Sequence, residues 1–145
     1  MSGKEVHSLE DIQIGDNIGP EPLFLAKDRV RAYCDAAGLH GVPRFTDDEL
    51  ARKEGLPGMI TPGNMSAALV GKLVTDWALP AHGRLVRLGT TYRSPVLPEH
   101  NLTLHGFVTE VDHGGRTAEV DIWIENEDGD RLVTATATIQ FPPKS

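Results

Sequence analysis

Apolar residues recur at spacings of three and four along one long stretch, Met59 to Ala78, and this period predicts the main helix of the protein. The small residue Gly71 lies within the same stretch and would let a neighbouring element approach the helix closely. The stripe is wide enough for a helix that a sheet wraps around. Its apolar members are Met65, Leu69, Val70, Leu73, Val74 and Trp77.

The start of this helix has an unusual sequence. The Thr61 hydroxyl is expected to cap the helix, and Pro62 suits the first helical position, where a missing N–H breaks no intrahelical bond. Gly63 and Asn64 would then lie in the first turn, whose N–H groups point outward at the positive end of the helix dipole. Such an end can bind an anion or a carbonyl oxygen that gains negative charge. The same cap and stripe also suit any buried helix, so the pattern alone leaves a purely structural role open.

Shorter patterns precede the main helix. Apolar alternation from Leu9 to Ile18 predicts an opening strand, and the proline-rich residues 19–22 predict a turn after it. An apolar face from Lys27 onward predicts a helix that Gly38 ends. The sequence T-D-D-E from Thr46 to Glu49 predicts a capping box that opens a further short helix.

The chain after Gly83 has the alternation of antiparallel strands. We expect strands at Leu85 to Arg93, Asn101 to Val111, Ala118 to Ile124 and Leu132 to Phe141, joined as a four-stranded meander. One strand, then helices, then four strands is an α+β arrangement in which one sheet curls around one helix.

Composition narrows the class of protein. The 145 residues suit one domain, residues 1–145, and 39% hydrophobic with 24% charged residues is ordinary for a globular protein. A net charge of −7 without a run of Lys or Arg argues against nucleic acid or a membrane surface as partner. One cysteine, Cys34, excludes a disulfide framework, and we expect it to be buried and inert. No metal-binding spacing, signal peptide or membrane span is found, so we expect no metal or cofactor and a cytoplasmic location.

Several motifs follow one family pattern in order along the chain. They are Ala37-Gly38, Pro43, the spacing of Asp47, Ala51 and Gly55 as D-x-x-x-A-x-x-x-G, Ile60-Thr61-Pro62-Gly63 in place of I-A-H-G, and Arg93-Ser94-Pro95-Val96 as R-x-P-V. Together with the order of elements, they resemble the MaoC-like (R)-specific enoyl-CoA hydratases and dehydratases. That resemblance implies the hot-dog fold, in which an antiparallel β-sheet wraps around a long central α-helix.

The resemblance also implies a reaction, the reversible addition of water to the double bond of an enoyl thioester on coenzyme A or an acyl carrier protein. In the family an Asp and a His move the proton, and an N–H at the helix start polarises the thioester carbonyl. Gly63 keeps the helix-start role in this chain. The acid–base pair is not kept, because Leu39 stands at the aspartate position and Phe45 at the histidine position.

Two accounts of the missing pair remain open. In the first, His40 acts as the acid–base group, helped by Asp35, Asp47 or Arg44, because an unperturbed histidine titrates near neutrality. The plainer interpretation makes His40 a solvated loop residue, Asp47 a first-turn acid and Arg44 a surface charge, although Arg44 also suits contact with the phosphates of a ligand.

In the second account the chain is a non-catalytic partner subunit of a heteromeric hydratase and shapes the acyl tunnel. Hot-dog proteins of this family form homodimers or heterodimers with sites at the interface, and Pro62 in place of the helix-start His is typical of supporting chains. The residues expected to bind the substrate are Leu39, Arg44, Phe45, Pro62 and Asn64. In the second account the apolar Leu39 and Phe45 line or plug the vestigial pocket. A hot-dog acyl-thioesterase ranks lower, because the main helix carries a single acid, Asp76, far from Gly63.

Overall fold

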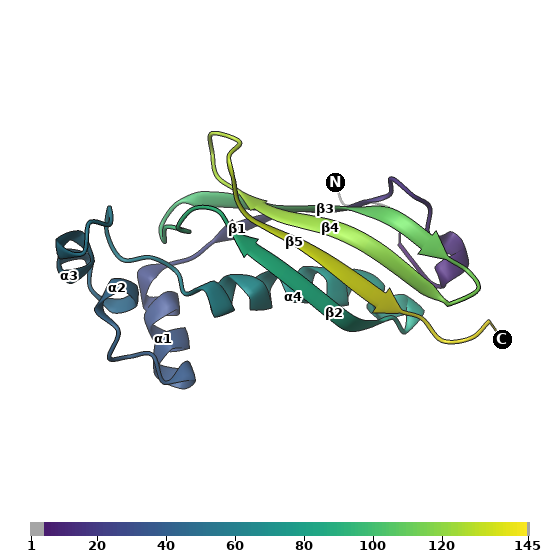
Figure 1. Ribbon diagram of the computed structural model, residues 1–145, viewed down its shortest axis with the longest axis horizontal. Helices are drawn as coiled ribbons and strands as arrows, with labels where there is room; N and C mark the ends of the chain where they lie inside the picture. Colours follow the sequence, from purple (N-terminus) through teal and green to yellow (C-terminus); the bar gives the residue numbers. More distant parts are fainter. Residues whose placement is uncertain (1–4, 145) are drawn as a thin grey trace.

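A five-stranded antiparallel sheet covers one long helix, as the computed structural model shows for residues 5–144 (Figure 1). Helix α4 (Gly63–Ala78) lies against one face of this sheet. The strands follow the order β1-β3-β4-β5-β2 across the sheet. Their bounds are β1 (Asn17–Phe24), β2 (Arg84–Tyr92), β3 (Asn101–Asp112), β4 (Thr117–Glu125) and β5 (Arg131–Gln140).

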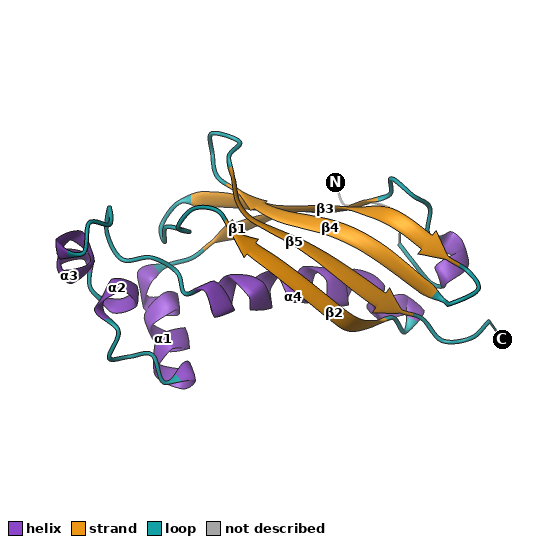
Figure 2. Cartoon of the chain, in the orientation of Figure 1, coloured by secondary structure: helices purple, strands orange, loops and turns teal. Residues whose placement is uncertain are grey.

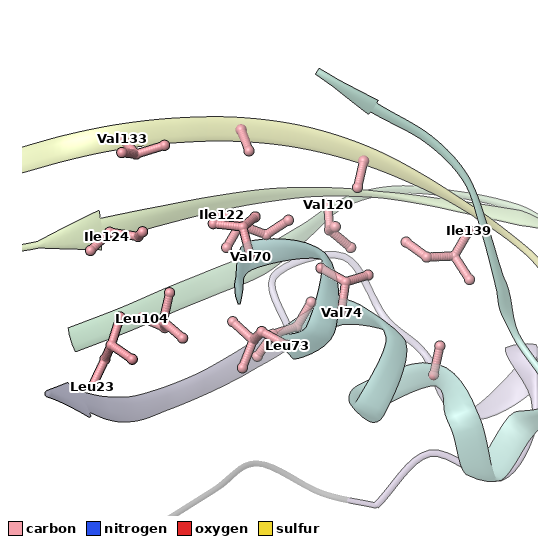
Figure 3. Packing of buried hydrophobic residues seen from close by; sticks show 14 of the residues in the cluster. Leu23, Val70, Leu73, Val74, Leu104, Val120, Ile122, Ile124, Val133 and Ile139 are labelled. Atoms are coloured by element: carbon pink, nitrogen blue, oxygen red, sulfur yellow. The ribbon is translucent and has the colours of Figure 1, made fainter. Parts of the chain in front are cut away.

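The core forms where the apolar stripe of α4 meets the inner face of the sheet. Buried and half-buried residues alternate along β3 and β4, as a period of two requires when one face of a sheet is covered. Figure 3 shows Val70, Leu73 and Val74 of α4 directed at the strands. The predicted stripe is therefore confirmed. The facing strand residues in Figure 3 are Leu23, Leu104, Val120, Ile122, Ile124, Val133 and Ile139.

Three shorter helices, α1 (Lys27–Ala37), α2 (Pro43–Thr46) and α3 (Asp48–Lys53), gather at one end of the molecule (Figure 2). Helix α1 ends as predicted, because Gly38 takes a φ of 76°, a left-handed conformation that glycine adopts without strain. Cys34 is fully buried on this helix, as expected. Two 3-10 segments, η1 (Leu9–Asp11) and η2 (Leu79–Ala81), complete the described elements. Among the described residues, no helix is long and apolar enough to cross a membrane.

The opening strand lies further along the chain than the alternation predicts. Residues Leu9–Asp11 form η1, and β1 begins at Asn17 and continues through the prolines that were expected to form a turn. Strand β1 is at the edge of the sheet, and its register against β3 shifts between Ile18 and Glu21. Edge strands with such irregularities accommodate proline, because its missing N–H breaks no ladder bond there.

The predicted four-stranded meander is wrong at β2. Strands β3, β4 and β5 follow one another as hairpins, but β2 pairs with β5 at the opposite edge from β1. Residues 93–100 therefore carry the chain across one end of the sheet from β2 to β3. This connection brings Ser94, Pro95 and Val96 to the start of α4.

The predicted capping box at Thr46 is also wrong. Asp47 is the N-cap of α3, and its side chain accepts a hydrogen bond of 2.9 Å from the Leu50 N–H. The Thr46 hydroxyl, at the end of α2, instead donates to the carbonyl of the α2 N-cap, Val42, at 3.1 Å. A carboxylate one residue later fills the same capping role, with a charge that suits the helix dipole.

Candidate functional site

A pocket of about 370 Å³ opens where α4 begins. Six parts of the chain meet there: helix α2, the segment before α4, the first turn of α4, the end of β2, the connection that follows it, and strand β5. The wall is largely apolar, with hydroxyl groups and two guanidinium groups among it. The lining residues are Arg44, Phe45, Ile60, Thr61, Gly63, Ser66, Tyr92, Arg93, Ser94, Pro95, Val96 and Val133.

The helix start has unused backbone donors, and Gly63, which carries one of them, lines this pocket. Pro62 is the N-cap, and its carbonyl accepts from the N–H groups of Met65 at 3.0 Å and Ser66 at 3.2 Å. Within the described residues, the N–H groups of Gly63 and Asn64 donate no hydrogen bond. They lie at the positive end of a helix of 16 residues. The prediction of free first-turn N–H groups is therefore confirmed.

The predicted cap at Thr61 is wrong by one residue. The Thr61 N–H donates to the Val96 carbonyl at 2.8 Å, which ties residue 61 to the β2–β3 connection. Pro62, with φ −58° and ψ 142°, then takes the capping position. No side chain caps α4, and the Thr61 hydroxyl is buried with no hydrogen-bond partner in the described part of the chain.

Tyr92, the last residue of β2, closes over the helix start. Its hydroxyl donates to the Gly63 carbonyl at 2.9 Å. A Cβ at Gly63 would lie 3.1 to 3.4 Å from three atoms of the Tyr92 ring, closer than ordinary contact. Gly63 therefore lets the strand end and the helix start approach each other, a packing role in addition to the N–H that it presents.

The helices at this end hold the approach to α4 in place. The Ile60 N–H donates to the Arg44 carbonyl at 2.8 Å, which joins α2 to the segment before α4. The Asp48 carboxylate accepts from the Met59 N–H at 3.0 Å and pairs with Lys27 at 2.9 Å. The Met59 hydrogen bond, followed by that from Lys27, lowers the pKa of Asp48. Asp48 is thus a positioning residue and not only a first-turn acid.

Some of the predicted site residues line the pocket, and the others lie beside it or away from it. Arg44, Phe45 and Gly63 line the pocket. Of the others, Pro62 is buried beside it and Asn64 is exposed on the first turn of α4. Leu39 is half-buried and packs against the core.

His40 lies outside the pocket lining and is exposed. Its proposed proton-transfer role stays a prediction. The suggested helpers lie in separate surroundings: Asp35 is exposed on α1, Asp47 caps α3, and Arg44 pairs with Glu54 at 3.5 Å. No Asp, Glu or His is present among the described residues that line the pocket.

The sequence did not assign the second wall of the pocket, which includes Tyr92, Arg93 and Val96. The R-x-P-V motif marked this segment, but its place beside α4 depends on β2 ending there, which the predicted meander did not require. Within residues 5–144, no group of His, Cys, Asp and Glu side chains is arranged to hold a metal ion.

Comparison with known proteins gives related folds and a family. The family model described as FAS1-like, dehydratase domain region, matches residues 12–135. The chain is similar to the ChsH1–ChsH2 complex from Mycobacterium tuberculosis, with 22% identity, a TM-score of 0.80, and coverage of 90% of this chain and 98% of that chain. An (R)-hydratase from A. caviae involved in PHA biosynthesis is 17% identical, with a TM-score of 0.83 and coverage of 92% and 99%.

A MaoC-like dehydratase from Rhodospirillum rubrum is 19% identical, with a TM-score of 0.77 and coverage of 95% of this chain and 99% of that chain. No curated protein matches the sequence significantly. At these identities the solved structures establish the fold, in which the antiparallel sheet wraps around α4. The family model covers most of the chain, so the protein belongs to the family of the FAS1-like dehydratase domain region, and its fold is the hot dog of the MaoC-like dehydratase structure.

Proposed function

We propose that the protein acts on an acyl thioester as a hydratase or dehydratase, adding water reversibly to the double bond of the acyl chain. The observation that carries this proposal is the pocket at the start of α4, where an apolar wall meets the unused Gly63 N–H. An apolar wall suits an acyl chain, and the N–H suits its thioester carbonyl.

The role of Gly63 follows from charge. When the oxygen of water bonds to the β-carbon of an enoyl thioester, negative charge develops on the thioester oxygen before a proton reaches the α-carbon. A hydrogen-bond donor at the positive end of α4 stabilises that charge more strongly than it binds the ground state, which lowers the barrier. The reverse reaction removes the α-proton, releases water and passes through the same charged oxygen.

The two arginines of the pocket support a thioester carrier that bears phosphate. Arg93 makes no ion pair or side-chain hydrogen bond within the described chain, and Arg44 pairs with the half-exposed Glu54 and lies over the Phe45 ring. Coenzyme A and the prosthetic arm of an acyl carrier protein both contain phosphate, the group that guanidinium binds through paired N–H donors. The proposal therefore leaves either carrier as substrate.

Proton transfer divides the proposal into two forms. In the first, His40 is the acid–base group and the chain, as a homodimer or larger assembly in the cytoplasm, is active by itself. In the second, the chain is the supporting subunit of a heteromeric hydratase, and a second hot-dog chain supplies the proton carrier. The absence of Asp, Glu and His from the described lining means that the proton carrier of either form lies outside that lining. It also argues against a thioesterase, and Asp76 is paired with Lys72 at 2.7 Å along α4.

The test measures hydration of trans-2-enoyl-CoA substrates of several chain lengths by the purified protein. If the chain is active alone, His40→Ala should remove most of the rate, while His113→Ala, an exposed histidine in the β3–β4 turn, should change little. Full activity in His40→Ala would refute the histidine's role. A chain that is inert alone but active after mixing with a sibling that carries Asp and His would establish the supporting role.

A further inference from the structure

The Thr61 hydroxyl is the unexplained polar group of the pocket. Thr61 is 5% exposed, and its Oγ1 is the single buried side-chain oxygen or nitrogen without a hydrogen-bond partner among residues 5–144. Nearly all buried hydroxyls in folded proteins are paired, because an unpaired one loses its bonds to water and gains nothing in return. Such a group calls for a partner that binds at the site.

Helix capping does not supply that partner. Pro62 occupies the N-cap, and no N–H of α4 donates to Thr61. The Thr61 backbone is already held by its bond to Val96, so the hydroxyl is not needed to place the segment. The neighbouring Tyr92 hydroxyl, by contrast, is already bonded to the Gly63 carbonyl. The Thr61 hydroxyl and the Gly63 N–H are thus two unused donors that lie close together in the chain at this end of the pocket.

We propose that the Thr61 hydroxyl and the Gly63 N–H donate to the same oxygen, the thioester carbonyl of the bound substrate. A carbonyl oxygen has two lone pairs and accepts two donors, and a threonine hydroxyl turns among the staggered positions of χ1 to reach a partner. Both residues line the pocket, two positions apart in the chain. This inference rests on the proposed function and extends it, because it makes Thr61 a substrate-binding residue that acts on the developing charge.

The consequence for specificity is that this site requires a carbonyl at the helix start. The family motif I-A-H-G has alanine where Thr61 stands, so the second donor belongs to the sequence of this chain. A ligand without an acceptor oxygen would leave both donors unpaired in a largely apolar pocket, which strongly disfavours its binding. An acyl thioester supplies the acceptor, and the corresponding thioether analogue does not.

The experiment compares Thr61→Val, which replaces the hydroxyl by a methyl group of similar shape, with Thr61→Ser, which keeps it. Turnover is measured on trans-2-enoyl-CoA, and binding on saturated acyl-CoA and its thioether analogue, with whichever assembly makes the wild type active. Thr61→Val should lower kcat/KM about 10²-fold, mostly through kcat, and should not lower the thermal midpoint, since it removes an unpaired buried hydroxyl. Thr61→Ser should recover most of the rate. The preference for the thioester over the thioether should be weaker in Thr61→Val than in the wild type and Thr61→Ser.

Three outcomes would overturn the role of Thr61 while leaving the proposed function intact. They are wild-type turnover in Thr61→Val, equal loss in Thr61→Val and Thr61→Ser, and a clear fall in the thermal midpoint of Thr61→Val, which would mean that the hydroxyl is bonded within the fold. A wild type that neither binds acyl-CoA nor turns over enoyl-CoA, alone or paired, would instead refute the proposed function and this inference with it.

Discussion

Removing the Tyr92 hydroxyl tests whether the strand end and the helix start hold each other. Tyr92→Phe deletes one hydrogen bond, the 2.9 Å bond to the Gly63 carbonyl, and leaves the ring in place. Tyr92→Ala also removes the ring that covers Gly63. The two variants therefore separate the hydrogen bond from the packing.

The expected losses in the free energy of unfolding follow from how much of the Tyr92 side chain is exposed. Tyr92 is 49% exposed, so water partly replaces its hydroxyl, and the lost bond costs about 0.5–1 kcal/mol, the lower part of the usual range. The buried half of the ring corresponds to roughly 100 Å², so its loss adds about 2 kcal/mol. For a chain of this length each kcal/mol lowers the thermal midpoint by roughly 2–4 °C.

Urea unfolding of wild type, Tyr92→Phe and Tyr92→Ala measures these differences as shifts of midpoint at constant slope. Tyr33→Phe is the matched control, since the half-buried Tyr33 makes no hydrogen bond through its hydroxyl to the described residues, and it should lose almost nothing. A loss above about 2 kcal/mol in Tyr92→Phe would mean that the hydroxyl is effectively buried. Equal losses in Tyr92→Phe and Tyr92→Ala would refute the packing of the ring on Gly63.

Two further predictions concern the core and the acid limit of stability. Ile122→Ala, at a 1% exposed position facing α4, should cost about 2–5 kcal/mol in urea unfolding, and a loss below about 1 kcal/mol would contradict close packing there. The pKa of Glu10 falls from 4.5 to about 2, chiefly through its hydrogen bond from Arg116. The Glu10–Arg116 pair thus stabilises the fold above pH 4.5 and loses this effect as pH falls to about 2. Between these pH values, the free energy of unfolding should fall less steeply with decreasing pH in Glu10→Gln than in the wild type. Parallel stability curves for the two proteins would contradict this prediction.

The elements that could be predicted from sequence are those whose environment repeats. Strand β4 and helix α4 each have one buried face, so their apolar residues follow a single period along the whole element. Strand β1 is at an edge, where prolines and a register shift are tolerated, and its sequence does not show the strand. The pairing of β2 with β5 was missed because alternation fixes which face of a strand is buried and not which strand is its neighbour.

The sequence predicted one wall of the pocket, the start of α4, because local sequence determines where a helix begins. The free N–H groups at Gly63 follow from where a helix begins, which caps and prolines indicate. Tyr92 and Val96 come from a segment some thirty residues later, and only the sheet order brings them to Gly63. Thr61 was wrongly predicted to be the N-cap because a threonine directly before a helix usually caps it. Here Thr61 is bound to the Val96 carbonyl and lies one residue before the actual N-cap, Pro62.

The position of Phe45 bears on how the two forms of the proposed function differ. Charge stabilisation and proton transfer are separable parts of the reaction, and they need different groups: fixed donors for the first, and a titrating side chain for the second. The Gly63 N–H is held in place by the first turn of a helix of 16 residues, and it stabilises charge without titrating. Phe45 lines the pocket at the position where the family pattern has histidine. It contributes apolar surface there, which favours binding of an acyl chain but moves no proton. The described lining offers a backbone donor and apolar surface but no Asp, Glu or His. Hydration after mixing with an Asp- and His-bearing sibling is therefore measured beside hydration by the chain alone, because the pair of results separates the two forms.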